Sequence, residues 1–282
     1  MSARRRSTLF APGHNRALLE KMSRCEPDCV VLDLEDGTPP AAKDEGRAVV
    51  AAALHEVDFG GAETIVRINA MDTALAARDI EWLRSLDHFP DAVMLPKVDS
   101  AADLAKFEEL LGRNGVPLWI LPTETAVGYR NLDESCQYPS VTAVIWAAED
   151  FAADIGANGS REPGGRLREV FRVARSNTLL AAKAAGISAI DTTYVDLKDL
   201  EGLRREALEC SGMGFDGKAA IHPSHVTVIN SIFQPDDASI EHAERLVEAF
   251  DSAGGGAISF GGRMVDAPHY KQARRLLARA GR

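Results

Sequence analysis

Eight short apolar segments recur along the chain, separated by longer stretches with helical periodicity. We expect them to be strands, near residues 7–11, 29–34, 64–68, 92–95, 118–122, 141–147, 187–191 and 217–221. Each is a continuous apolar run, which is typical of strands buried on both faces. Eight such strand–helix alternations predict an α/β fold, a closed (β/α)8 TIM barrel. A doubly wound open sheet is the alternative, but no nucleotide-binding glycine fingerprint accompanies the strands.

Helix signals fill the stretches between the strands. Residues 40–57 have apolar residues at helical spacing and begin beside two prolines, which favour a first helical turn. Residues 100–112 open with Ser100 as an expected N-cap. Residues 166–185 are rich in alanine and end at Gly186, a residue that commonly stops a helix.

The chain is longer than a minimal barrel needs. We expect residues 1–234 to form the barrel domain and residues 235–282 to form a C-terminal extension with helices at 237–253 and 268–281. Glycine clusters flank a short apolar segment between those two helices. A helical module joined through glycines is expected to act as a lid or as an oligomerisation arm.

Composition excludes several classes of function. The net charge of −10 argues against a nucleic-acid or anionic-membrane surface, because both need clustered lysine and arginine. No apolar run reaches the roughly 18 residues of a membrane span, and no signal-peptide core is present, so we expect a cytoplasmic protein. The four cysteines form no C-x-x-C pairs, which indicates reduced thiols rather than a zinc site.

Acidic residues follow two neighbouring predicted strands. Glu124 comes just after the fifth strand and Asp150 just after the sixth. Adjacent strands in a barrel are about 5 Å apart, so the two carboxylates would repel each other unless a proton or a cation intervened. Mg²⁺ commonly takes one or two protein carboxylates and leaves its other positions for water and substrate. We therefore expect a magnesium site, the alternative being that each carboxylate caps a helix or pairs with an arginine.

Arg67 ends the third predicted strand at the same rim. A guanidinium there can bind a carboxylate through two hydrogen bonds or stabilise an enolate oxygen. The competing interpretation is a salt bridge to a neighbouring acid. The excess of acids at this rim permits either role.

Three further acids end the second predicted strand. Alternation along a strand sends Asp33 and Glu35 to one side and Asp36 to the other. One of them is expected to face the metal site as a base or water holder. The others are expected to cap the next helix or to pair with Lys43 or Arg47.

Two lysines follow later strands. Lys97, after the fourth strand, could reach an anion, although exposed lysines usually only bind water. Lys218 and the nearby His222 are expected to be parts of a structural strand end, because no nucleophilic serine or cysteine motif accompanies the histidine.

Seven motifs in order resemble one protein family. They are Ser7-Thr8-Leu9-Phe10-Ala11-Pro12-Gly13, Leu32-Asp33-Leu34-Glu35-Asp36, Val66-Arg67-Ile68-Asn69, Leu95-Pro96-Lys97, Glu124-Thr125, Ala148-Glu149-Asp150-Phe151 and Gly217-Lys218-Ala219-Ala220-Ile221-His222-Pro223. The chain resembles the HpcH/HpaI aldolase/citrate lyase family, in its citrate lyase β-subunit-like branch. Its tail, residues 262–268, resembles that branch's C-terminal signature. Ala148 stands where relatives usually have glycine, and His14 also departs from the common pattern.

The resemblance implies a Mg²⁺-dependent barrel that makes or breaks carbon–carbon bonds in acyl thioesters. It assigns the metal to Glu124 and Asp150 and substrate binding to Arg67, and it matches Asp266 to a residue of the C-terminal signature. We also expect Glu124 to contact the substrate, and Arg67, Asp36 and Asp266 to take part in catalysis. In related lyases the residue matching Asp266 comes from a neighbouring subunit. The implied partners are an acyl-CoA thioester and a 2-oxo acid, in a homotrimer or hexamer, with no nucleic acid and no membrane.

The expected reaction is reversible cleavage of a 3-hydroxyacyl-CoA thioester such as malyl-CoA or citramalyl-CoA. A 2-oxo acid leaves, and an acyl-CoA remains. Three alternatives stay open: a citrate lyase β subunit that acts on a carrier-protein thioester within a complex, a non-catalytic regulator that binds CoA or an oxo acid, and a condensing enzyme that forms malate.

Overall fold

The computed structural model describes residues 4–282 and divides them into two compact units. One unit consists of residues 5–230, and the other consists of residue 4 together with residues 231–282. The division falls inside helix α10 (Pro223–Phe233). The first three residues of the predicted barrel domain lie outside the described residues.

Eight parallel strands close into a barrel in sequence order, with β1 paired both to β2 and to β8. The strands are β1 (Ser7–Pro12), β2 (Cys29–Asp33), β3 (Glu63–Arg67), β4 (Ala92–Pro96), β5 (Leu118–Leu121), β6 (Val141–Ile145), β7 (Ser188–Asp191) and β8 (Gly217–Ala220). The closure confirms the predicted barrel. The open-sheet alternative is wrong, since an open sheet would leave two unpaired edges.

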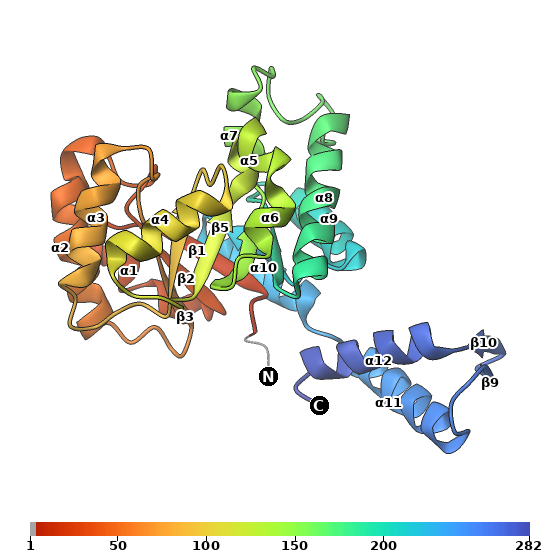
Figure 1. Cartoon of the computed structure of the whole chain (residues 1–282). Coiled ribbons are helices and arrows are strands. Elements are labelled where there is room, and N and C mark those ends of the chain that lie inside the picture. The colour runs from red at the N-terminus through yellow and green to blue at the C-terminus, as the bar shows by residue number, and fades with distance from the viewer. Residues whose placement is uncertain (1–3) are drawn as a thin grey trace. The chain divides into compact units, whose positions relative to one another are not determined.

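Helices surround the strands, with α2, α3 and α4 on one side and α6, α8 and α9 on another (Figure 1). The longer helices are α2 (Lys43–Glu56), α3 (Ala74–Arg84), α4 (Ala101–Leu111), α8 (Glu169–Ala185) and α9 (Leu200–Met213). The shorter ones are α1 (Arg16–Leu19), α5 (Ala126–Arg130), α6 (Leu132–Cys136), α7 (Ala148–Asp154) and the 3-10 turns η1 (Met22–Cys25), η2 (Pro40–Ala42) and η3 (Pro122–Glu124). Among residues 4–282, none of the helices has the length and apolar character needed to cross a bilayer.

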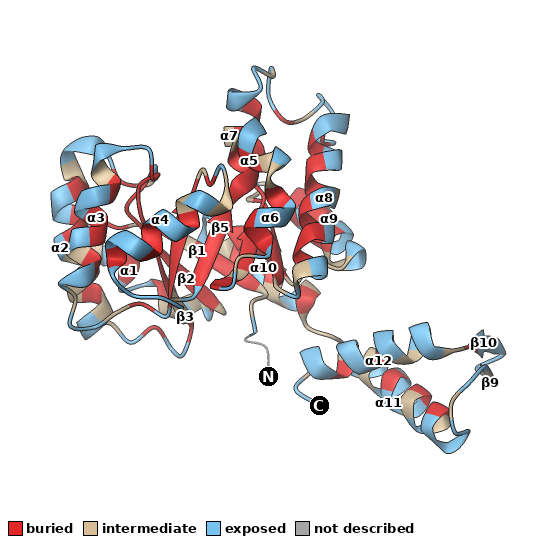
Figure 2. Ribbon diagram, in the orientation of Figure 1, coloured by how far each residue is buried: buried red, intermediate tan, exposed pale blue. Residues whose placement is uncertain are grey.

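The barrel interior is apolar along its middle and polar at its amino end. Figure 2 shows the strands buried and the outer helix faces exposed. Arg5 closes the amino end: its guanidinium pairs with Glu63 at 2.7 Å, donates to the Thr142 carbonyl at 2.8 Å and lies 4.7 Å from the Trp119 ring centroid. Side chains therefore fill this end, and the hollows of the barrel lie at the carboxyl ends of the strands.

The predicted elements are present with ends shifted by a few residues. The expected helix at 40–57 is a 3-10 turn followed by α2, because Pro40 opens the segment and the regular helix begins only at Lys43. The helix expected at 100–112 is α4, and Asp103 accepts a hydrogen bond from the Ser100 backbone N–H at 3.0 Å, closing its first turn.

The C-terminal unit contains two long helices and a small hairpin. The helices α11 (Asp237–Ser252) and α12 (Ala267–Arg279) lie side by side, and β9 (Ile258–Phe260) pairs antiparallel with β10 (Arg263–Val265) (Figure 1). Leu246, Val265 and Leu277 belong to its apolar core. The predicted helical extension is confirmed, and the hairpin is a further element that the sequence did not predict. Gly261 and Gly262, at φ 57° and 76°, form its two-residue turn, which few other residues could adopt.

A cluster of buried charges joins Asp191, the last residue of β7, to Lys218, the second residue of β8. The fully buried Lys218 ammonium donates to Asp191 at 2.9 Å, to Glu206 at 2.7 Å and to the Thr192 carbonyl at 2.6 Å. Arg175 binds Asp191 from the other side at 2.9 and 3.0 Å. Burial pushes the pKa of the Asp191 carboxyl upward, but Lys218 and Arg175 outweigh it and hold that pKa well below its usual value.

We predict that Lys218→Met lowers the free energy of unfolding by about 3–5 kcal/mol, because it leaves buried carboxylates without their cation. The matched control is Lys183→Met, which removes a lysine paired with Asp216 at 2.5 Å on the surface. That change should cost about 1 kcal/mol or less. Urea unfolding of the three proteins measures the difference. Equal losses would show that the buried cluster adds nothing beyond a surface pair.

Candidate active site

An ion pair between neighbouring strands organises the carboxyl end of the barrel. Asp33 and Arg67 are the last residues of β2 and β3 and are partners in register. The Arg67 guanidinium donates to the two Asp33 carboxylate oxygens at 2.8 and 2.7 Å. It also lies 3.1 Å from Glu35 and 5.2 Å from the Phe10 ring centroid. The salt bridge that competed with substrate binding in the sequence analysis is therefore present.

The turn after β2 is built around Asp33. Its carboxylate accepts the backbone N–H groups of Glu35 at 2.9 Å and Gly37 at 2.8 Å. A Cβ at position 37 would lie 2.3 Å from the Asp33 oxygen, so only glycine lets the turn close this tightly. Burial opposes ionisation of Asp33, but Arg67 and these N–H groups lower its pKa overall. Asp33 is therefore an anion, and in that form it holds Arg67 in place.

The pairings expected for the acids after β2 are partly wrong. Lys43 donates to the backbone carbonyls of Leu34 and Glu35, both at 2.7 Å, and to Asn69 at 2.8 Å. Arg47 pairs with acids of its own helix and of α3 instead. Both cations are therefore already occupied, and Lys43 supports the turn through its backbone carbonyls.

The expected separation of Asp36 from Asp33 and Glu35 is also wrong. β2 ends at Asp33, so strand alternation no longer governs the residues that follow. Asp36 and Asp33 line the same hollow, and the Asp36 carboxylate lies 3.5 Å from the Lys97 ammonium. Its side chain is 66% exposed, whereas that of Glu35 is buried. Asp36 is thus the acid of this turn that solvent or a ligand reaches most easily.

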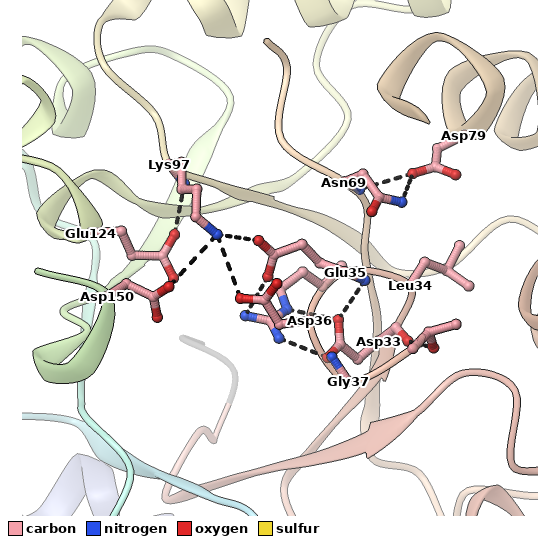
Figure 3. Close-up of polar contacts among 12 residues, drawn as sticks. Asp33, Leu34, Glu35, Asp36, Gly37, Asn69, Asp79, Lys97, Glu124 and Asp150 are labelled. Atoms are coloured by element: carbon pink, nitrogen blue, oxygen red, sulfur yellow. Dashed lines mark hydrogen bonds and ion pairs between the residues drawn. The ribbon is translucent and has the colours of Figure 1, made fainter. Parts of the chain in front are cut away.

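Lys97 connects the acids of three strands. Its ammonium binds Glu35 and lies 3.7 Å from Asp150, while its backbone N–H donates to Glu124 at 2.7 Å. Figure 3 shows it between the acids that follow β2 and those that follow β5 and β6. Its φ of 49° is left-handed, which is costly for a lysine and is maintained here by the bond to Glu124. The expected contact with an anion is present, but the anions are the protein's own carboxylates.

Glu124 and Asp150 lie together at the carboxyl end of the barrel, as predicted. We call this end, with the hollows beside it, the barrel mouth. Glu124 is buried in η3, and Asp150 is in the first turn of α7 with its side chain 36% exposed. Burial, with a contribution from Asp150, raises the pKa of Glu124 to about 8, while Arg67 opposes the shift. A carboxyl in this position ionises more readily when a further cation is near.

The donor set suits a hard divalent ion. Glu124 and Asp150 offer carboxylate oxygens just after adjacent strands. The Lys97 backbone N–H donates to Glu124, and the Lys97 ammonium lies 3.7 Å from Asp150. Within residues 4–282 no group of three histidine, cysteine or acidic side chains is arranged around a metal position. Mg²⁺ does not require such a cage, because it commonly keeps water and substrate oxygens as ligands beside one or two carboxylates. The residues present therefore fit magnesium.

Two hollows meet at these carboxylates. A hollow of about 360 Å³ over the barrel axis includes Phe10, Arg67, Trp146, Glu124 and Asp150 in its walls. A second, of about 470 Å³, shares the two carboxylates and also includes Lys97 in its wall. Its other acids are Asp72, Asp99, Asp103 and Asp154. A ligand bound at Glu124 and Asp150 can therefore extend in either of two directions.

The segment after β6 that joins α7 to α8 is attached to its surroundings at Ser160 and Arg161. Ser160 donates to Glu149 at 2.8 Å, and Arg161 pairs with Glu206 at 2.7 Å and lies 5.6 Å from the Tyr194 ring centroid. Glu206 also binds Lys218, so the segment is tied to the buried charge cluster. Tyr194 and Glu206, the partners of Arg161, are far from it in the sequence.

Asp266 belongs to the C-terminal unit. It is the N-cap residue of α12, and its carboxylate lies 2.6 Å from Nδ1 of His269. Its side chain is 39% exposed, so the group is accessible to another molecule.

A closed parallel barrel with ionised side chains gathered at the carboxyl ends of its strands has the architecture of the (β/α)8-barrel enzymes. The chain belongs to the HpcH/HpaI aldolase/citrate lyase family, whose model matches residues 6–223. Residues 168–282 also match the carbon–carbon bond lyases of the TIM-barrel fold. Relatives named as citrate lyase β subunits or as similar to them confirm the predicted branch.

Individual relatives match over nearly the whole chain. The mitochondrial citramalyl-CoA lyase of Homo sapiens is 36% identical over 98% of this chain and 85% of its own length. The (3S)-malyl-CoA thioesterase of Cereibacter sphaeroides is 37% identical over 98% of this chain and 94% of its own. The crystal structure of CitE from Mycobacterium tuberculosis with magnesium, acetoacetate and coenzyme A superposes with a TM-score of 0.85, at 35% identity and full coverage of both chains.

Proposed function

We propose that this protein is a magnesium-dependent carbon–carbon lyase that reversibly cleaves a 3-hydroxyacyl-CoA thioester, such as malyl-CoA or citramalyl-CoA, into a 2-oxo acid and an acyl-CoA. The observation that carries the proposal is the mouth itself, where Arg67 and Lys97 lie among carboxylates beside two hollows. Whole-length similarity to a citramalyl-CoA lyase and to CitE supports the same chemistry.

Glu124 and Asp150 are the proposed magnesium ligands. The CitE structures that contain magnesium support this cofactor for the family. When bound, Mg²⁺ acts as a Lewis acid that lowers the pKa of a substrate hydroxyl group. Lys97 has two roles in this arrangement: its backbone N–H orients Glu124, and its ammonium offsets the charge of Glu35.

Arg67 is the proposed binding group for the 2-oxo acid, with Glu124 also facing the substrate. Two of the Arg67 nitrogens are occupied by Asp33, so the remaining edge near Glu35 is the part that a substrate oxygen can reach. The charge on Arg67 persists at all working pH values, because Asp33 and Glu35 outweigh burial and raise the pKa of the guanidinium. A fixed cation of this kind stabilises negative charge that develops on an oxo-acid or enolate oxygen, typically by about 3–4 kcal/mol.

Two acids are proposed to move protons. Asp36 is exposed at the mouth and can accept the proton of the substrate hydroxyl group as the carbon–carbon bond breaks. The electrons of that bond pass to the thioester enolate, which must then be protonated at carbon. Asp266 is the proposed acid for this step, and in the reverse direction the base.

Three other functions can be distinguished from the proposed one by experiment. The relative named as a malyl-CoA thioesterase shows that this family includes thioester hydrolysis. A citrate lyase β subunit would act on a carrier-protein thioester within a complex, and a regulator would bind CoA or an oxo acid without turnover. Charged groups retained at the mouth favour a catalyst over a regulator. A cytoplasmic location also stays a prediction.

We expect purified protein with Mg²⁺ to release a 2-oxo acid and an acyl-CoA from malyl-CoA, citramalyl-CoA or a close analogue. Chromatography of the products distinguishes cleavage from hydrolysis, because hydrolysis releases free CoA and an intact hydroxy acid. Chelation of the metal should abolish oxo-acid release, and excess Mg²⁺ should restore it. Hydrolysis alone, or turnover of only a carrier-protein thioester, would contradict the proposed reaction.

Asp150→Asn should weaken Mg²⁺ binding and lower turnover by about a hundredfold or more, because loss of even an outer metal partner costs roughly 10- to 100-fold. Calorimetry with Mg²⁺ measures the affinity, and circular dichroism checks the fold. Asp154→Asn is the matched control, since Asp154 lines the same hollow but accepts the Ala126 backbone N–H at 2.7 Å. Unchanged Mg²⁺ affinity in the first variant would rule out Asp150 as a ligand.

We further propose that the C-terminal unit supplies Asp266 to the barrel mouth of a neighbouring copy in a trimer or hexamer. Residues 235–282 would then serve both as a lid and as an oligomerisation arm. Charge supports this arrangement. Helix α12 exposes Lys271, Arg274 and Arg275, whereas the larger hollow at the mouth is lined with acids. A head-to-tail contact of this kind closes under threefold symmetry.

Hybrid oligomers test the shared site. Asp150→Asn and Asp266→Asn copies, each inactive alone, are expressed together under different affinity tags, and particles that contain both are isolated. Activity should return in the hybrids, because one copy contributes an intact barrel and another an intact Asp266. Isolated hybrids without activity would show that Asp266 does not act across an interface.

A further inference from the structure

Two histidines from different segments meet on the outside of the barrel. His55 is in the last turn of α2, and His88 follows α3 by four residues. Their Nδ1 atoms are 3.1 Å apart, and Nδ1 of His55 is 3.4 Å from Nε2 of His88. The ring centroids are 4.4 Å apart and the ring planes are tilted by 49°. Both side chains are exposed.

The pair lies far from the carboxylate mouth along the barrel axis. His55 is in the segment that leads into β3, and His88 is in the segment that leads into β4. Both segments therefore lie at the amino ends of strands whose carboxyl ends carry Arg67 and Lys97. Helix α2, which carries His55, is joined to α3, which precedes His88, by the Arg47–Asp79 ion pair, whose side chains are nearly or fully buried.

The spacing of the ring nitrogens suits a shared metal ion. Nitrogen ligands lie about 2.0–2.1 Å from Zn²⁺, so two of them are roughly 3.3 Å apart at a tetrahedral angle and roughly 2.9 Å apart at a right angle. Each ring can offer one nitrogen to a given ion, and the Nδ1–Nδ1 separation of 3.1 Å lies between those two values. Within residues 4–282 neither ring has another hydrogen-bonding or ionic partner, so a metal would displace only water and the contact between the rings.

We propose that His55 and His88 form a two-histidine site for a borderline divalent ion, of which Zn²⁺ and Ni²⁺ are examples. Imidazole nitrogen suits these ions, whereas Mg²⁺ prefers oxygen ligands. The ion would join the end of α2 to the segment between α3 and β4, with water in its open positions. The competing arrangement is a hydrogen bond in which one ring donates its N–H to the other.

Calorimetric titration of the full-length, tag-free protein with Zn²⁺ in excess Mg²⁺ tests the site. The excess Mg²⁺ limits binding of Zn²⁺ at Glu124 and Asp150. His55→Ala and His88→Ala should each weaken one Zn²⁺-binding event by about tenfold or more. The double variant should lose little beyond either single one, because one histidine alone cannot chelate. His242→Ala, which removes an exposed histidine on α11, should leave the affinity unchanged.

A second readout separates metal binding from a structural role of the ring contact. Zn²⁺ should raise the urea midpoint of the wild-type protein and of His242→Ala, because a ligand of the folded state stabilises it. Zn²⁺ should not raise the midpoint of either site variant, and lyase turnover with saturating Mg²⁺ should be unaltered in both. Equal Zn²⁺ binding by all the proteins, or its loss only in Asp150→Asn, would show that the two rings merely share a hydrogen bond.

Discussion

The ion pair between Asp33 and Arg67 is the contact around which the barrel mouth is arranged. It joins the last residues of two adjacent strands, and it fixes a cation where parallel strands deliver many acids to one rim. Without that cation, Glu35 and Glu124 would be buried carboxylates with one fewer positive neighbour. The tight turn at Gly37 exists because Asp33 has to reach both Arg67 and the backbone of the turn.

Lys97 completes this balance by a different means. Because its backbone is left-handed, Lys97 donates its amide N–H to Glu124 while its ammonium binds Glu35. Because the two interactions use separate atoms, an incoming cation can move the ammonium while the amide still orients Glu124. The orientation of the buried carboxylate is therefore set before any ligand arrives.

The sequence predicts the barrel and the gathering of its strand-end residues well, because burial on both faces and strand–helix alternation are local signals. It predicted that Glu124, Asp150 and Arg67 lie at the same end of the barrel. It did not predict that Asp36 joins Asp33 in one hollow, since β2 ends before strand alternation could apply to the turn. The Lys97 contacts also depend on a backbone conformation that residue type does not suggest. The β9–β10 hairpin was missed because three-residue strands give almost no periodic signal.

The segment after β6 is attached at Ser160 and Arg161, close to its middle, to Glu149 and Glu206. In this arrangement the two anchoring residues must stay constant, whereas the residues that follow them are free to vary. Residues 162–166 form a turn that is closed by the antiparallel bridge between Arg161 and Leu167, and their side chains are exposed. Substitutions there can change this exposed surface while the anchors keep the segment in place. In an evolving family, such a stretch can accept sequence change that leaves the charged centre of the barrel untouched.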